Sequence, residues 1–147
     1  MRGYSLMELV VVLAVLAVAA AVTAPGVART AEGVRARAEV GAVAGFLRSA
    51  REQAVTRQHP LEVVIDREAH ALVVRRAGRE GEAAVHASLT ISPRLRIAAD
   101  PAAPRVRFLP HGMSSGGRFT VEAPGARAYV ITVDALTGRV STARQGS

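Results

Sequence analysis

The N-terminal sixth of the chain is almost entirely apolar, and this pattern predicts a helix that spans a membrane. Every residue from 9 to 22 is Leu, Val or Ala, and Glu8 is the one ionisable residue between positions 4 and 24. A helix needs about 20 apolar residues to cross a bilayer, which this stretch provides. A cleaved secretory signal peptide is the alternative, with its site among the small residues near position 24. Glu8, Pro25 and the helical pattern that continues beyond them argue against it.

The next segment predicts an amphipathic helix that ends at His59-Pro60. Pro25-Gly26 weakens helices, so a bend or local melting is expected there. Farther on, apolar residues recur at spacings of three and four and therefore share one face, which we expect to pack on a domain. This face carries Val43, Phe46, Leu47, Ala50 and Ala54, and the largely opposite face carries Arg48, Arg51 and Glu52.

After Pro60 the apolar period changes from helical to strand-like. Two short Val-rich runs, 61–65 and 71–75, are joined by a polar connector of hairpin length. Turn residues separate the remaining runs. The predicted fold class is therefore α+β, with one long helix packed on an antiparallel β-sheet domain. The further predicted strands are 85–91, 95–98, 106–109, 119–121, 128–133 and 139–142.

The amino-acid composition excludes some kinds of site but does not identify a function. The chain has no cysteine, which excludes disulfides and thiolate metal sites. All 19 basic residues are Arg, and the net charge is +7. Net charge informs association rather than fold, so this surplus alone does not identify a nucleic-acid-binding protein.

Glu8 is the informative residue of the apolar segment. A carboxylate in hydrocarbon costs several kcal/mol, so such groups usually have a partner. Two interpretations stay open: Glu8 reaches the lipid headgroups, or it pairs with the N-terminus of another chain.

The segment 3–13 reads GYSLMELVVVL and resembles the prepilin signature of type IV pilins and type II secretion pseudopilins. The resemblance implies that a prepilin peptidase cuts between Gly3 and Tyr4 and methylates Tyr4, where the family usually has Phe. It also implies a single-pass protein of the cell inner membrane, with the N-terminus in the cytoplasm and the C-terminal domain in the periplasm. The implied organisation is a leader (1–3), a membrane-spanning and filament-core helix (4–24), an amphipathic helix (25–59) and a β-rich periplasmic domain (60–147).

Later segments narrow the resemblance to the GspH/FimT-type minor pilins along almost the whole chain. These segments read LRSAREQA (47–54), VVID (63–66), FLPHG (108–112), YVITVD (129–134) and LTGRV (136–140). Two functions follow from the resemblance. The favoured one is a structural subunit near the tip of the periplasmic type II secretion pseudopilus, assembled with other pseudopilins and in reach of secreted substrates.

The alternative is a FimT-like minor type IV pilin whose basic domain binds DNA for natural transformation. Arginine contacts to phosphate dominate non-specific DNA affinity, and Arg139 and Arg144 are the residues expected to make them. The DNA-binding FimT group resembles a Gly-Arg-x-Arg ending, whereas this chain has Val140 and Ser141 after Arg139.

Catalytic patterns were weighed and set aside. Residues 112–116 match G-x-S-x-G, but that motif needs a strand-turn-helix context and a later histidine, and none follows His111. His59, His70, His86 and His111 show no metal-binding spacing. The sequence therefore predicts neither an enzyme nor a metal or cofactor site.

Overall fold

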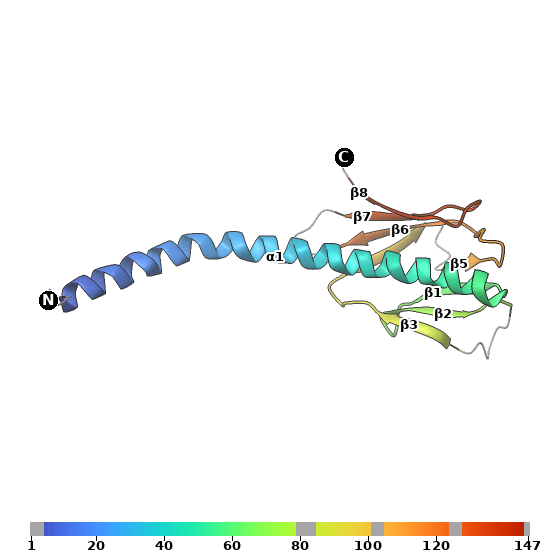
Figure 1. Ribbon diagram of the computed structural model, residues 1–147, viewed down its shortest axis with the longest axis horizontal. Helices are drawn as coiled ribbons and strands as arrows, with labels where there is room; N and C mark the ends of the chain where they lie inside the picture. Colours follow the sequence, from blue (N-terminus) through green and yellow to red (C-terminus); the bar gives the residue numbers. More distant parts are fainter. Residues whose placement is uncertain (1–4, 79–84, 101–104, 124–127, 146–147) are drawn as a thin grey trace.

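The computed structural model describes residues 5–78, 85–100, 105–123 and 128–145 (Figure 1). One long helix, α1 (Leu6–Arg57), extends far beyond a β domain that covers only its second half. The strands are β1 (Leu61–Asp66), β2 (Ala71–Arg76), β3 (Val85–Thr90), β4 (Arg96–Asp100), β5 (Arg105–Phe108), β6 (Gly117–Glu122), β7 (Tyr129–Val133) and β8 (Val140–Arg144).

Helix α1 is continuous from one end to the other. The predicted local melting at Pro25-Gly26 is therefore wrong, although α1 curves gently over its first half (Figure 1). A proline disfavours a helix by roughly 3 kcal/mol, but the surrounding turns are rich in alanine, the best helix former. The helix ends where Gln58 adopts a left-handed conformation (φ 53°) and its N–H bonds to Val55 O, just before Pro60.

The second half of α1 buries the predicted apolar face. Leu47, Ala50 and Ala54 have no solvent exposure, whereas Phe46 is half-buried at the edge of the core. The placement of Arg51 on the solvent face was wrong, because this side chain is half-buried. Arg51 follows Leu47 by four residues, one helical turn, and so lies at the border of the packed face.

Eight described strands form two four-stranded antiparallel sheets, in the orders β3-β2-β1-β5 and β4-β6-β7-β8. The predicted hairpin is confirmed as β1 and β2, paired from Leu61↔Arg76 to Asp66↔Ala71. The predicted strands are also confirmed, with ends that differ from the observed ones by at most two residues.

The core lies where α1 meets the inner faces of both sheets. Its largest fully buried side chains include Phe108 from β5, Leu47 from α1 and Ile131 from β7. Each fully buried side chain of this size contributes about 1.5–3 kcal/mol. The core therefore joins α1 and both sheets into one packed unit, while the first half of α1 takes no part in it.

Candidate functional site

The first half of α1 is an apolar surface that the chain itself leaves uncovered. The segment Leu6–Thr23 has a mean hydropathy of 2.6, and none of it is buried. Among the described residues it is the one helical segment long and apolar enough to cross a membrane. Contiguous exposed apolar surface of this size marks a membrane or protein contact.

Glu8 lies at the start of this apolar surface. It is exposed in the first turn of α1, where its N–H donates to Ser5 O at 3.0 Å. The partial positive charge of a helix N-terminus favours a carboxylate there. No ion pair joins Glu8 to another described side chain. Gly3 and Tyr4, the predicted processing residues, lie outside the described residues.

The G-x-S-x-G segment is a structural turn. Ser114 is buried, and its Oγ donates to Asp134 O at 2.8 Å while accepting the Gly116 N–H at 2.9 Å. The first bond holds the β5–β6 connection against the β7–β8 turn, and the second lies within the β5–β6 connection. The Ser114 hydroxyl is thus engaged in packing two turns together.

The β7–β8 turn is itself closed by Asp134. Its Oδ1 accepts the Thr137 N–H and the Thr137 hydroxyl, each at 2.8 Å. The hydrogen bonds from the Thr137 hydroxyl and the Thr137 N–H hold the pKa of this carboxyl below the ordinary 3.8. This geometry gives the Thr-Gly-Arg-Val segment a structural role at the end of the domain.

The two arginines predicted to bind DNA are not brought together. Arg139 lies in the turn before β8 and Arg144 at the far end of that strand. Five residues of extended chain place their Cα atoms about 16 Å apart. Arg144 instead lies over Tyr129, with its Cζ 6.0 Å from the ring centroid. Burial raises the pKa of Tyr129, but the nearby guanidinium groups of Arg37 and Arg144 outweigh this effect and lower the pKa below 10.0.

The histidines do not converge either. Within the described part of the chain, no group of three or more His, Asp or Glu side chains is placed to hold a metal ion. His86 Nδ1 lies 3.3 Å from an Arg57 guanidinium nitrogen, and His59 Nδ1 lies 2.9 Å from Gln58 O.

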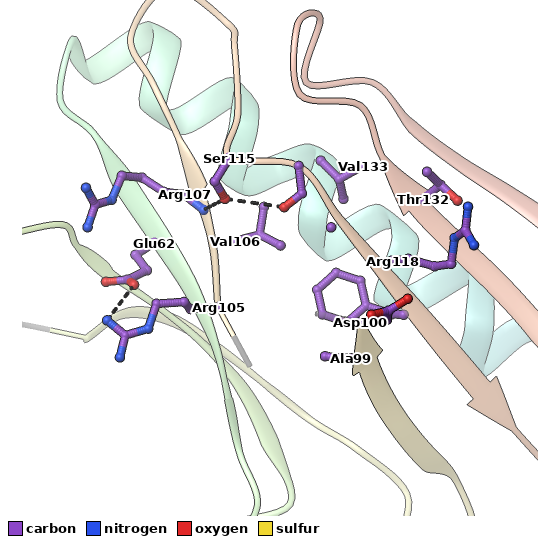
Figure 2. Close-up of a pocket in the computed structure, with 13 residues that line it drawn as sticks. Glu62, Ala99, Asp100, Arg105, Val106, Arg107, Ser115, Arg118, Thr132 and Val133 are labelled. Atoms are coloured by element: carbon purple, nitrogen blue, oxygen red, sulfur yellow. Dashed lines mark hydrogen bonds and ion pairs between the residues drawn. The ribbon is translucent and has the colours of Figure 1, made fainter. Parts of the chain in front are cut away.

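A crevice of about 660 Å³ lies between the two sheets (Figure 2). Buried Val106, Phe119 and Val133 form its apolar floor. Figure 2 shows Arg105, Arg107 and Glu62 to one side of β5, with Arg118 and Asp100 across the crevice.

Glu62 is the residue of this crevice that sequence reasoning missed. Its side chain is only 6% exposed, and it forms ion pairs with Arg105 (3.5 Å) and Arg75 (3.8 Å). Its Oε1 accepts no hydrogen bond from the described residues. A lone acidic residue within the apolar run 61–65 was the available signal, because buried carboxylates are rare unless paired.

Comparisons with known proteins agree with this architecture. The family model described as "Type II transport protein GspH" matches residues 39–137. A search of curated proteins gives no match.

Solved structures share the fold at low sequence identity. The type IV minor pilin FimU of Pseudomonas aeruginosa is 14% identical, with a TM-score of 0.66 over 79% of this chain and 93% of that one. The minor pseudopilin EpsH from the type 2 secretion system of Vibrio cholerae is 15% identical, with a TM-score of 0.59 over 79% of this chain and 99% of that one. Both are pilin-like proteins, which confirms the predicted pilin-like fold.

Proposed function

The chain belongs to the GspH family of type II transport proteins, and we propose that it is a minor pseudopilin of the type II secretion system. In this role it is a structural subunit near the tip of the periplasmic pseudopilus and supports protein export. It is anchored in the cell inner membrane by one helix, and its C-terminal domain lies in the periplasm.

The division of α1 into two halves carries this proposal. Leu6–Thr23 is apolar and wholly uncovered, whereas the second half of α1 is built into the β domain. A soluble protein would expose a large apolar surface to water with this design. A subunit that moves between a bilayer and a bundle of helices needs both parts. These are the apolar segment Leu6–Thr23, which we call the shaft, and a separately folded domain.

Family membership implies assembly with other pilin-like subunits, and the shaft has the composition for it. Apart from Glu8 and Thr23, the described shaft contains Leu, Val, Ala and Met. Small side chains such as Ala permit close approach of helices where water is absent. In that bundle Glu8 pairs with the cationic N-terminus that a prepilin peptidase creates at Tyr4 of an adjacent subunit. Such a pair matters most in a low-dielectric interior, where an unpartnered charge is strongly destabilising.

The test is a deletion strain complemented with the full chain. We expect secreted enzymes to accumulate in the periplasm of the deletion strain and to return to the medium on complementation. The control is a chain with Val15→Arg, which keeps the β domain but places a charge within the shaft at a cost of about 2.5–3.5 kcal/mol. Normal secretion in the deletion strain would contradict the proposal.

The same strains test the alternative of a DNA-binding minor pilin. If the chain is a DNA-binding minor pilin, the deletion strain should lose the uptake of labelled DNA, and its secretion should be unchanged. It also expects Arg139→Ala and Arg144→Ala each to reduce uptake. We favour secretion because the family model that residues 39–137 match describes a type II transport protein.

A further inference from the structure

The end of strand β8 marks the side of the β domain that lies nearest the shaft. Val140, at the start of β8, accepts a hydrogen bond at 3.3 Å from Arg48 of α1. At the end of β8, Arg144 lies over the ring of Tyr129, and Arg37 of α1 is close to the same residue. Arg37 precedes Arg48 by three helical turns and so shares its face of α1. Strand β8 therefore runs toward the shaft and ends at the side of the domain from which the shaft extends (Figure 1).

The length of α1 places this side close to lipid headgroups when the shaft spans a bilayer. A hydrocarbon core about 30 Å thick takes about 20 residues of helix. Counted from Glu8, the core ends near position 28, and Arg37 lies about 13 Å farther along the helix axis at 1.5 Å per residue. A headgroup layer of about 5–7 Å covers half of that distance. The rest is shorter than the screening length of about 8 Å at physiological salt, and helical side chains tilt toward the N-terminus, here toward the lipid.

Two arginines converge on Tyr129 from different elements. Tyr129 begins β7 and pairs with Arg144 in the β7–β8 register, whereas Arg37 comes from α1. The Arg144 Cζ atom lies 6.0 Å from the ring centroid, and both guanidinium groups are near enough to lower the pKa of the phenol. Tyrosine is common where a protein meets lipid headgroups, since its ring is apolar and its tip is polar. The three side chains together offer several hydrogen-bond donors on one surface.

Carboxylates do not neutralise these two arginines within the described part of the chain. Neither Arg37 nor Arg144 forms an ion pair with a described residue. Glu39 is two residues from Arg37, a spacing that directs the two side chains to different faces of α1. Glu122 lies directly opposite Arg96 in the β4–β6 register. Two positive charges therefore stand beside the Tyr129 phenol without an acidic partner among the described residues.

We propose that Arg37, Tyr129 and Arg144 bind the phosphate group of an anionic phospholipid and hold this end of the β domain on the membrane surface. Guanidinium groups bind phosphate oxygens through charge-assisted hydrogen bonds, often two at a time. The Tyr129 hydroxyl supplies a further donor. The shaft keeps the lipid surface within reach, so a weak site is enough to fix the orientation of the domain. The inference rests on the membrane anchor of the proposed function but not on a role in secretion.

The test uses the full chain reconstituted in vesicles, with a fluorophore on one introduced cysteine, since the chain has none of its own. Ala143→Cys labels the end of β8, and Leu136→Cys labels the exposed β7–β8 turn beyond its other end. The vesicles contain phosphatidylcholine alone or an equimolar mixture with phosphatidylglycerol, and a nitroxide on some headgroups quenches nearby fluorophores. We expect quenching at position 143 to be at least twofold stronger with phosphatidylglycerol, and quenching at position 136 to be equal in both lipids.

The variants test whether the arginines cause this lipid preference. Arg37→Gln and Arg144→Gln should each remove most of the difference at position 143, because an amide carries no charge to pair with the phosphate. Arg76→Gln is the matched control, since it makes the same change at an exposed residue of β2 opposite Leu61, beyond the C-terminal end of α1, and should leave the difference unchanged. Added salt should reduce the difference in the wild type, because the attraction is screened. Thermal unfolding by circular dichroism verifies that each variant is folded.

Equal quenching at position 143 in both lipids would overturn the inference, as would an unchanged difference in either Arg37→Gln or Arg144→Gln. Flotation of the chain with the vesicles tests the anchor separately. A chain that does not float would contradict the anchor and this inference together, whereas a floating chain without a lipid preference contradicts this inference alone. Binding of a single-stranded oligonucleotide that depends on Arg37 and Arg144, with no lipid preference, would overturn it in favour of a nucleic-acid surface.

Discussion

Arg51 and Thr137 are separated by most of the β domain in sequence but joined in space, since Arg51 Nε donates to Thr137 O at 3.1 Å. The same nitrogen donates to Gly112 O at 3.2 Å. One guanidinium on α1 therefore holds both the β5–β6 connection and the β7–β8 turn against the helix. This contact makes the C-terminal turn part of the packing of α1.

Gly138 is the position where this packing leaves no room for a side chain. Its φ is +63°, and a Cβ there would collide with Gly112 O and lie 2.8 Å from Arg51 Nε. We expect Gly138→Ala to lower the free energy of unfolding by about 1–3 kcal/mol more than a substitution at an uncrowded glycine of positive φ. Gly78→Ala is that control, since its φ is +97° and nothing lies within 4 Å. Urea unfolding followed by circular dichroism measures both, and equal losses would refute the crowding.

Asp134 links this turn to pH. Its pKa is depressed in the folded state, so it stabilises the fold above about pH 3.8 and loses that contribution as the pH falls through the folded pKa. Thr137→Val removes the hydroxyl donor and should move the Asp134 pKa up toward 3.8. The pH dependence of stability below this value then becomes shallower. Carboxyl NMR titration measures the pKa, and an unchanged value in Thr137→Val would contradict this account.

The two halves of α1 should be separable. A fragment that begins at Ala28 keeps every residue of the buried core and loses the uncovered apolar segment. We expect it to be soluble without detergent, folded and monomeric, because its helix remains covered by both sheets. Size-exclusion chromatography and circular dichroism test this. A fragment that precipitates unless detergent is present would show that the domain needs the shaft.

Processing between Gly3 and Tyr4 is the next prediction. Intact-mass measurement of protein extracted from membranes should show the loss of Met1, Arg2 and Gly3 and the gain of one methyl group. The comparison strain lacks its prepilin peptidase and should yield the unprocessed mass. A mature chain that begins near Pro25 would instead show cleavage of a signal peptide and remove the anchor.

Glu8→Gln separates the two interpretations of this carboxylate. If Glu8 only reaches the headgroups, the amide should leave insertion and secretion unchanged, because it is easier to accommodate in lipid. If Glu8 pairs with the N-terminus of a neighbour, the variant should be inserted and cleaved but enter the filament poorly. Cross-linking to partner pilins, alongside a secretion assay, decides between them. Wild-type values in both assays would defeat the pairing.

Sequence predicted the elements of this fold better than their arrangement. The strand limits followed from apolar runs and turn residues, which are local signals. Strand β5, which pairs with β1, lies about 40 residues away from it in the chain. The alternation of apolar and polar residues within a strand does not show which other strand it pairs with. Two separate sheets, rather than a single one, were not foreseen for the same reason.

Site residues were predictable only where a side chain differed in chemical kind from its neighbours in the sequence. Glu8 is conspicuous because it interrupts an apolar helix. Arg51 was misplaced because a periodic pattern assigns a long cationic side chain to solvent, whereas its guanidinium donates to two backbone carbonyls, Gly112 O and Thr137 O. The G-x-S-x-G pattern was set aside as a nucleophile motif, but the bond from Ser114 to Asp134 O was not predictable, because it depends on a contact between distant turns.

The uncovered shaft also restricts how the subunit can travel. Exposing the 18 residues of Leu6–Thr23 to water would cost on the order of tens of kcal/mol. In the proposed role, a subunit free in the periplasm is therefore strongly disfavoured. Each subunit then meets its neighbours while its apolar segment, about 27 Å long at 1.5 Å per residue, is still in the lipid. Under the same proposal, these encounters take place in two dimensions, within the plane of the membrane.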